Sequence, residues 1–172
     1  GGGGSVLTIP ILMFFFNKSF NESTSYSLII IFFIALLSTV DSFEKKLIPI
    51  RPLVLFGISS ISGVFFGRTY LFHYFPESIS MILFICIMFF SAFLIVNNKT
   101  KFALKLSARN IIVQGLLVGI LTALLGIGGG FLIVPTLIIF QKMDIKQAIR
   151  SALFLMLLNS SCAIFIDLHQ MY

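Results

Sequence analysis

Four apolar stretches of about bilayer-spanning length constrain the fold of this 172-residue chain more than any other feature. A helix needs about 20 mostly apolar residues to cross the hydrocarbon core of a bilayer. A segment in lipid must also satisfy its own backbone polar groups, which favours helices over other structures. We therefore expect a multi-pass integral protein of the cell membrane, an all-α polytopic helix bundle with spans at residues 25–40, 53–72, 79–96 and 151–166.

The composition agrees with the membrane class, because 58% of the residues are hydrophobic and only 10% are charged. Soluble domains carry about 25% charged residues, so this chain cannot cover a soluble surface. The net charge of +6 comes from basic residues that stand mostly between the apolar stretches. No basic patch interleaved with aromatic residues forms a polar face, so a nucleic-acid partner is not expected.

The cysteine and histidine residues give no sign of a metal site or a cofactor. Cys86 and Cys162 each lie inside an apolar stretch, and the chain has no CxxC motif. His73 and His169 are far apart and have no acidic or cysteine neighbours at ligand spacing. We therefore expect no metal, no cofactor, and two cysteines that act as small apolar side chains.

The charges of the connecting segments predict the orientation of the spans. Residues 97–110 contain basic side chains and no acid, which places them in the cytoplasm by the positive-inside rule. If the spans are counted backwards from there, residues 73–78 lie outside, residues 41–52 inside and residues 17–24 outside. The net basic charge of residues 41–52 agrees with this alternation.

Two further apolar stretches have lengths that do not suit a single crossing. Residues 6–16 are too few to span as a helix, and residues 111–140 are too many for one simple span. The longer stretch is interrupted by glycines, which stand at positions 126, 128, 129 and 130. Two interpretations stay open: one broken helix, or two half-length helices that meet at the glycines as a re-entrant pair.

The same glycine motif occurs twice in the chain. Residues 1–12 read GGGGSVLTIPIL and residues 126–137 read GIGGGFLIVPTL, at a constant separation of 125 positions, as from Gly1 to Gly126. Both fit the pattern G-x-G-G-[GS]-x-L-x-[IV]-P-x-L, with the proline and the leucines in register. A synthetic linker would not reproduce this pattern, so we interpret the opening glycines as native sequence and the chain as two internal repeats.

The repeats define the expected domain organisation. Residues 1–96 form a first transmembrane repeat, residues 97–110 a basic cytoplasmic loop, and residues 111–172 the start of a second repeat. We expect the chain to begin within the first motif, without the leading half-helix that corresponds to residues 111–125. We also expect about three further segments after the chain, as counterparts of residues 53–96.

The relative orientation of the two repeats depends on how residues 111–140 cross the membrane. A single broken crossing makes the repeats parallel and puts residues 141–150 outside. A re-entrant pair returns residues 141–150 to the cytoplasm and makes the repeats inverted. The net basic charge of residues 141–150 favours the inverted arrangement.

Glycines at a break in a membrane helix can build an anion site from the backbone alone. Glycine adopts positive φ angles and lets a ligand approach the chain closely. A helix that starts after the glycines presents free N–H groups and the positive end of its dipole. Such breaks at corresponding positions of two repeats mark the binding sites of transporters. The candidate substrate-binding residues are Gly1, Gly3, Gly4, Ser5, Pro10, Gly126, Gly128, Gly129, Gly130, Pro135 and Asn159.

These polar and glycine positions also have structural interpretations. Glycines in membrane helices often serve close packing between helices, and Asn159 can equally form an interhelical hydrogen bond. Arg68 is the only charge well inside a predicted span. It is expected to snorkel to the outer interface, with a gate or an anion attractor as the alternative. Asp167 is expected to mark an interface.

Residues 115–135, which read GLLVGILTALLGIGGGFLIVP, resemble the signature of the sulfite exporter TauE/SafE family. The first glycine motif resembles the N-terminal copy of the same signature, so the resemblance extends over essentially the whole chain. It departs from the family at AIRSALF, where Arg150 stands in a segment that tends to be of a Thr-Ser-Leu type. The resemblance implies a membrane transport protein for sulfite, sulfonates or related organic anions.

The functional hypothesis is a secondary transporter, a permease or exporter, of small sulfur-containing anions that bind at the paired glycine breaks. No P-loop Lys-Ser/Thr follows the glycines, so a nucleotide is not expected to drive transport. Neither GxSxG nor a Ser/His or paired-carboxylate arrangement occurs at spanning depth, so an enzyme is not expected. The alternatives are a passive anion channel and a non-transporting membrane subunit. The expected partners are a small anionic substrate and the lipid bilayer, and homo-oligomer formation is left open.

Overall fold

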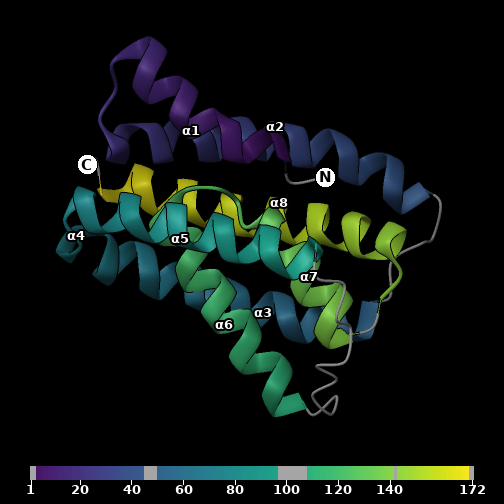
Figure 1. Ribbon diagram of the computed structural model, residues 1–172. Helices are drawn as coiled ribbons and strands as arrows, with labels where there is room; N and C mark the ends of the chain where they lie inside the picture. The colour runs from purple at the N-terminus through teal and green to yellow at the C-terminus, as the bar shows by residue number, and fades with distance from the viewer. Residues whose placement is uncertain (1–2, 45–49, 97–107, 142, 171–172) are drawn as a thin grey trace.

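The computed structural model describes residues 3–44, 50–96, 108–141 and 143–170. Every regular element in this part of the chain is helical, which confirms the all-α class (Figure 1). The elements are α1 (Gly3–Phe16), α2 (Phe20–Glu44), α3 (Ile50–Phe66), the π-helical turn η1 (Gly67–Leu71), α4 (Phe72–Tyr74), α5 (Glu77–Val96), α6 (Ala108–Leu125), α7 (Gly130–Gln141) and α8 (Ile145–Gln170).

Three of the described helical segments are long and apolar enough to cross a membrane, by length and composition. They are Phe20–Thr39 in α2, Leu53–Leu71 across α3 and η1, and Ile145–Gln170 in α8. Three of the predicted spans coincide with them, those at residues 25–40, 53–72 and 151–166. The fourth predicted span falls on α5, of which Glu77–Phe89 is a shorter apolar helix. Most of the predicted loop 97–110 lies outside the described residues, and α6 already begins at Ala108.

A capping box starts α2 earlier than the hydrophobic pattern predicts. The Glu22 N–H donates to the Ser19 hydroxyl at 3.2 Å, and the Ser19 N–H donates to the Glu22 carboxylate at 3.3 Å. These two bonds satisfy donors that the first turn of a helix leaves unpaired. The prediction of a connection over residues 17–24 is therefore wrong from Phe20 onward, and only residues 17–19 join α1 to α2.

Two side-chain pairs fix the direction of α3 relative to α8. Ser60 bonds to Asn159 and Arg68 bonds to Asp167, and both pairs are separated by 99 positions. A constant separation means that α3, continued by η1, runs parallel to α8. The chain of α2 runs the opposite way, because Ser25 near its beginning bonds to Asp167 near the end of α8 (Figure 1).

Glycines bring α3 and α6 into backbone contact. A Cβ added at Gly119 would overlap the carbonyl oxygen of Ser60, and one added at Gly63 would overlap that of Leu116. Close approach through small residues is a common way to pack membrane helices. The contacts advance together along both helices, since Gly67 meets Ala123 one turn further on. Therefore α6 is parallel to α3 and to α8, and α7 must return the chain from the end of α6 to the beginning of α8.

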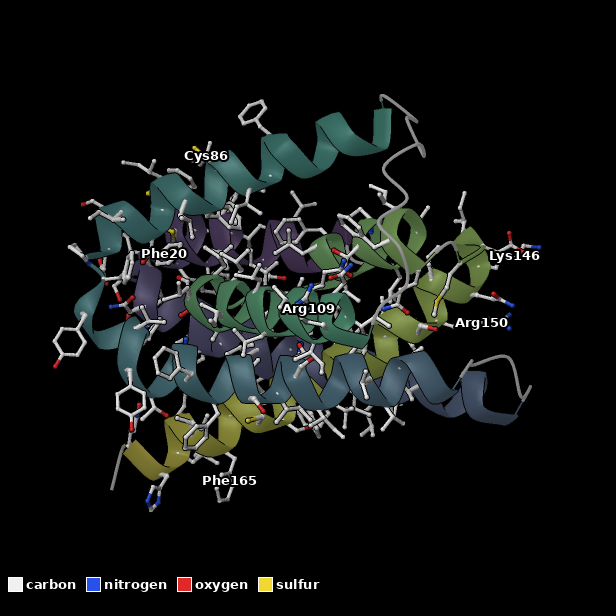
Figure 2. All side chains as sticks on the ribbon, turned by 90° about the horizontal axis from the view of Figure 1, so that it is seen from below. Phe20, Cys86, Arg109, Lys146, Arg150 and Phe165 are labelled. Carbon is white, nitrogen blue, oxygen red and sulfur yellow. The ribbon has the colours of Figure 1, made fainter. Side chains whose placement is uncertain are left out.

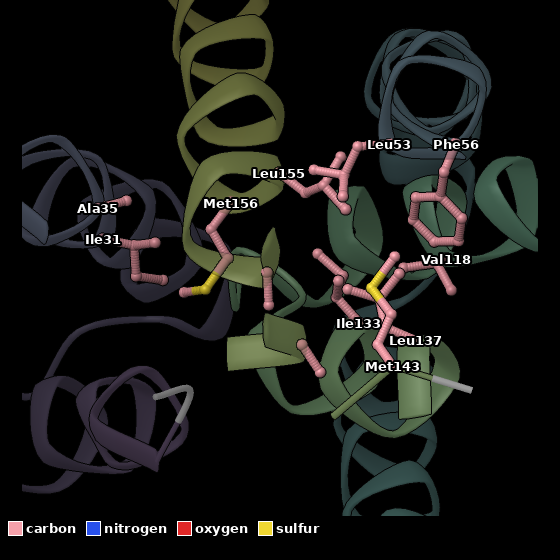
Figure 3. Close-up of a cluster of buried hydrophobic side chains, with 12 residues drawn as sticks. Ile31, Ala35, Leu53, Phe56, Val118, Ile133, Leu137, Met143, Leu155 and Met156 are labelled. Carbon is pink, nitrogen blue, oxygen red and sulfur yellow. The ribbon is translucent and has the colours of Figure 1, made fainter. Parts of the chain in front are cut away.

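An apolar core joins α2, α3, α6, α7 and α8. Figure 3 shows its side chains, which include Ile31, Ala35, Leu53, Phe56, Val118, Ile133, Leu137, Leu155 and Met156. The outer surface is apolar as well, with Phe15 of α1 and Phe89 of α5 largely exposed. Several hydroxyl and amide side chains lie inside instead. An apolar exterior around a partly polar interior suits a bundle surrounded by lipid.

Two basic side chains lie near one end of the bundle. Lys146 and Arg150, near the beginning of α8, lie at the end of the molecule opposite Phe20 (Figure 2).

The last residues of α1 and α7, Phe16 and Gln141, are 125 positions apart. The first residues of α2 and α8, Phe20 and Ile145, have the same separation.

Candidate functional site

The second glycine motif forms a sharp reversal between two helices. α6 ends at Leu125 and α7 begins at Gly130. Gly126, Gly128 and Gly129 have φ angles of 62°, 61° and 78°. This left-handed region costs L-residues with a side chain roughly 1–2 kcal/mol each, and glycine little. The glycines therefore let the chain turn back within a few residues.

Hydrogen bonds define both sides of the reversal. The Gly126 N–H donates to the Thr122 carbonyl at 3.0 Å and closes α6. The N–H groups of Leu132 and Ile133 both donate to the Gly129 carbonyl, at 2.9 and 2.7 Å, and open α7. The first N–H groups of a helix have no acceptor within it, and the helix dipole is positive there. The beginning of α7 thus points amide donors at the glycine segment.

The glycine segment is buried and closely packed against α2. All residues from Gly126 to Gly130 are buried. A Cβ added at Gly126 would overlap the Thr24 Cβ, and one added at Gly128 would lie 2.5 Å from the Ile31 Cγ2. The reversal therefore has no room for even a methyl group on the side that faces α2.

Two buried hydroxyl groups beside the reversal have no hydrogen-bond partner among the described residues. Thr122 is 1% exposed, and a Cβ added at Gly129 would overlap its Oγ1. Ser27 is 0% exposed and stands three residues after Thr24 and four before Ile31, on the face of α2 that packs against the glycines. A buried polar group without a partner costs about 1–3 kcal/mol. Such groups require an explanation, and a ligand that bonds to them is one.

The first glycine motif lies partly outside the described residues. Gly1 is not described, and Gly3, Gly4 and Ser5 belong to the first turn of α1, where only the backbone is described. Pro10 lies inside α1 next to Ile9, which is buried in one apolar cluster with Ile127 of the reversal. The helix that contains most of the first motif therefore packs beside the second motif.

Pro135 and Asn159 lie apart from the reversal itself. Pro135 is buried within α7, six residues after Gly129. Asn159 is 0% exposed and donates through Nδ2 to the Ser60 hydroxyl at 2.8 Å, while that hydroxyl donates to Oδ1 at 3.0 Å. This is the interhelical hydrogen bond that was one of its two interpretations. Among the described residues, no group of three His, Cys, Asp or Glu side chains could hold a metal ion.

The snorkelling predicted for Arg68 is wrong. Its side chain is 0% exposed, and its Nε and Nη2 donate to the two carboxylate oxygens of Asp167 at 2.5 and 2.6 Å. Its Nη1 donates to the carbonyl of Ala123 at 3.1 Å, near the end of α6. The sequence contained a signal for this pair, because two opposite charges in apolar segments are best satisfied by each other.

Comparison with known proteins gives a family and one relative. The family model described as "Sulfite exporter TauE/SafE" matches residues 1–171. A protein of Methanocaldococcus jannaschii named "Probable membrane transporter protein MJ0441" is 42% identical over 72 residues, which are 39% of this chain and 27% of that protein. The match thus spans about a quarter of that relative's length. No solved structure matches the chain.

Proposed function

The chain belongs to the sulfite exporter TauE/SafE family, and we propose that it forms part of a secondary transporter for small sulfur-containing anions such as sulfite and sulfonates. The family and the apolar helices support a membrane permease or exporter rather than an enzyme. The relative named a membrane transporter supports the same class. The substrate class rests on the family description and on the chemistry of the glycine segment.

We propose that residues 1–96 and 111–172 are two internal repeats joined by the basic cytoplasmic loop 97–110. The helix ends support this, because the separation of 125 positions that relates the glycine motifs also relates α1 to α7 and α2 to α8. The opposite directions of α2 and α8 support an inverted arrangement, in which α6 and α7 form a re-entrant pair. Basic residues at the beginning of α8 then favour the cytoplasm for that end, and the end with Phe20 lies outside.

One observation carries the proposal of an anion site. The glycine reversal joins the amide donors at the beginning of α7 to the unpartnered hydroxyl of Thr122, both buried inside the bundle. Irregular backbone at membrane depth is tolerated where it is buried in protein, and helix beginnings attract anions. We propose that the N–H groups of Gly128, Gly129 and Gly130 bind the substrate together with Thr122. Gly126, Pro135 and the first motif, with Gly1, Gly3, Gly4, Ser5 and Pro10, would shape the same site.

The transport proposal is tested with the full-length protein in proteoliposomes. Uptake of labelled sulfite and of labelled methanesulfonate is expected, with a rate that saturates as the anion concentration rises. Gly129→Ala is expected to lower the flux strongly, because alanine at a φ of 78° is strained and its Cβ would overlap Thr122. Gly57→Ala is the matched control, because its Cβ would meet only movable side-chain atoms, the Leu155 Cδ2 at 3.3 Å and the Leu158 Cδ1 at 3.7 Å.

The outcomes separate the competing functions. A flux that rises without saturation would favour a passive anion channel. The absence of flux of both anions by the wild-type protein would contradict the transport proposal. A non-transporting subunit predicts, in addition, that Gly128→Val disrupts assembly of the protein with its partners.

A further inference from the structure

The pair formed by Arg68 and Asp167 is the centre of a closed polar network inside the bundle. Arg68 Nη2 donates to the Ser25 hydroxyl at 2.6 Å, and that hydroxyl donates to Asp167 Oδ2 at 2.9 Å. The Asp167 side chain is 19% exposed and that of Arg68 is 0% exposed. An unpaired charge in such surroundings costs several kcal/mol, so each partner is stable only with a counter-charge.

This network touches the glycine reversal from two sides. Arg68 donates to the carbonyl of Ala123, and Gly126 begins the reversal three residues later. Ser25 follows Thr24, the residue whose Cβ packs against Gly126. The cation thus stands at the negative end of the α6 dipole, directly before the segment where we propose that the anion binds.

The local backbone around Arg68 is unusual. Residues Gly67–Leu71 form a π-helical turn between α3 and α4. π-helical turns are rare and occur frequently at functional sites. The guanidinium carbon lies 3.8 Å from the centre of the Phe72 ring, so the arginine is held between an aromatic face and a carboxylate.

The charges around Arg68 limit how a substrate anion can bind there. The backbone amides of a helix beginning supply only about half a positive charge. The nearest full positive charge in the contacts described is Arg68, and Asp167 already neutralises it. Two anions sharing one guanidinium in apolar surroundings repel each other. An ionised Asp167 carboxylate without Arg68 is also unfavourable in these surroundings, and binding a proton removes this cost.

We infer that the substrate anion replaces Asp167 on Arg68 while Asp167 binds a proton, so that one anion and one proton move together. This inference rests on the proposed transport function. The Arg68–Asp167 ion pair, one monovalent anion and one proton become an Arg68–anion pair and a neutral Asp167 carboxylic acid. One O–H bond forms on Asp167, no other covalent bond changes, and the net charge of the site is zero before and after.

Other ionisable groups on the surrounding elements are separated from this pair. Glu22 of α2 is exposed and pairs with Lys18 at 3.8 Å. α7 contains no ionisable residue, and Arg109 of α6 lies at the far end of that helix. The remaining groups at this end are the exposed Glu77, whose carboxylate accepts from the Asn21 N–H at 3.5 Å, the exposed Tyr26, Tyr70, Tyr74 and His169, the half-buried Cys162, and His73, whose side chain is not described. His73 and His169 are therefore included as controls.

The test uses the full-length protein in proteoliposomes with the membrane voltage held at zero. The probe is methanesulfonate, which stays a monovalent anion at every pH used, so that a pH effect belongs to the protein. Acid outside by one pH unit is expected to drive accumulation of about tenfold in the wild type, the limit for one proton per anion. Asp167→Asn is expected to abolish this accumulation but to retain exchange of internal for external methanesulfonate. Arg68→Gln is expected to abolish both.

Controls and opposite outcomes make the test decisive. Asp144→Asn, His73→Gln and His169→Gln are expected to keep the wild-type response to the pH gradient. A second measurement needs no variant. When methanesulfonate is added to the wild-type protein in weakly buffered solution, the protein is expected to take up about one proton from the solution per anion bound. Wild-type flux that ignores the pH gradient, anion binding without proton uptake, or a wild-type response in Asp167→Asn would overturn the coupling alone. The absence of wild-type flux of both methanesulfonate and sulfite would overturn the transport function itself.

Discussion

Ser60 of α3 and Asn159 of α8 exchange two hydrogen bonds in the interior of the bundle. Arg68 and Asp167, eight residues further along the same two helical paths, repeat the connection with an ion pair. The two pairs hold α3 and α8 parallel and in one register. They make the interior between these helices polar at two levels, while the helices present apolar side chains outward.

Removing one member of the Ser60–Asn159 pair should destabilise the protein more than removing both. Ser60→Ala leaves the buried Asn159 amide without its partner, at a cost of about 1–3 kcal/mol. Ser60→Ala combined with Asn159→Leu replaces the polar contact by an apolar one, so the loss should be smaller. Thermal unfolding in detergent measures the stability of the single and the double variant. If the stability loss of the double variant equals the sum of the losses in Ser60→Ala and Asn159→Leu, the two side chains do not interact as a pair.

The Arg68–Asp167 pair should behave in the same way with a larger amplitude. Arg68→Met or Asp167→Leu alone leaves an uncompensated buried charge, which costs about 3–5 kcal/mol. The double variant should recover most of this stability, because apolar side chains of similar size can replace a buried ion pair. The comparison is made by thermal unfolding. Single variants as stable as the wild type would show that the pair is not buried as described.

Gly119 should tolerate no side chain at the contact between α3 and α6. In Gly119→Ala the new Cβ would overlap the backbone carbonyl of Ser60, and a backbone atom cannot move aside as a side chain can. We expect a loss of about 1–3 kcal/mol from overpacking, read as a lower melting temperature. Gly57→Ala is the control and should change it little. Equal effects of the two variants would exclude the close approach of these helices.

Cys86 should report on the lipid-facing surface of α5. It is exposed on the outer side of this helix (Figure 2), and Cys162 of α8 is half-buried. In membranes, Cys86 is expected to react with a small apolar maleimide but not with a membrane-impermeant sulfonated one. After solubilisation and denaturation both cysteines should react with either reagent. Rapid reaction of Cys86 with the charged reagent in intact membranes would place this face of α5 in water.

Most of the fold follows from the hydrophobic pattern, since apolar stretches in lipid have few alternatives to helices. The hydrophobic pattern does not predict where helices begin and end, because polar side chains determine these positions. The beginning of α2 was predicted too late because Ser19 and Glu22 form a capping box before the apolar residues start. Gly126, Gly128 and Gly129, which the sequence analysis selected as candidate site residues, have positive φ angles that glycine adopts at little cost.

The contacts around the glycine segment could not be predicted in the same way. Thr122 and Ser27 are ordinary residues of apolar helices. Only the fold shows that their hydroxyls are buried beside Gly129 and on the facing side of α2, with no partner in the part of the chain that the structure describes. Arg68 and Asp167 were noticed as charges but not as a pair. Their pairing depends on the parallel direction of α3 and α8, which the sequence does not state.

Binding of methanesulfonate to the full-length protein in lipid nanodiscs shows whether the glycine reversal binds the anion. Thr122→Val removes the hydroxyl aimed at Gly129 and keeps the shape of the side chain. We expect this change to weaken binding about tenfold, because one hydrogen bond to a charged group is lost. Ser62→Ala removes an exposed hydroxyl of α3 and should leave the dissociation constant unchanged. Equal affinities of the wild type and Thr122→Val in calorimetry would show that the anion does not bind at the glycine reversal beside Thr122.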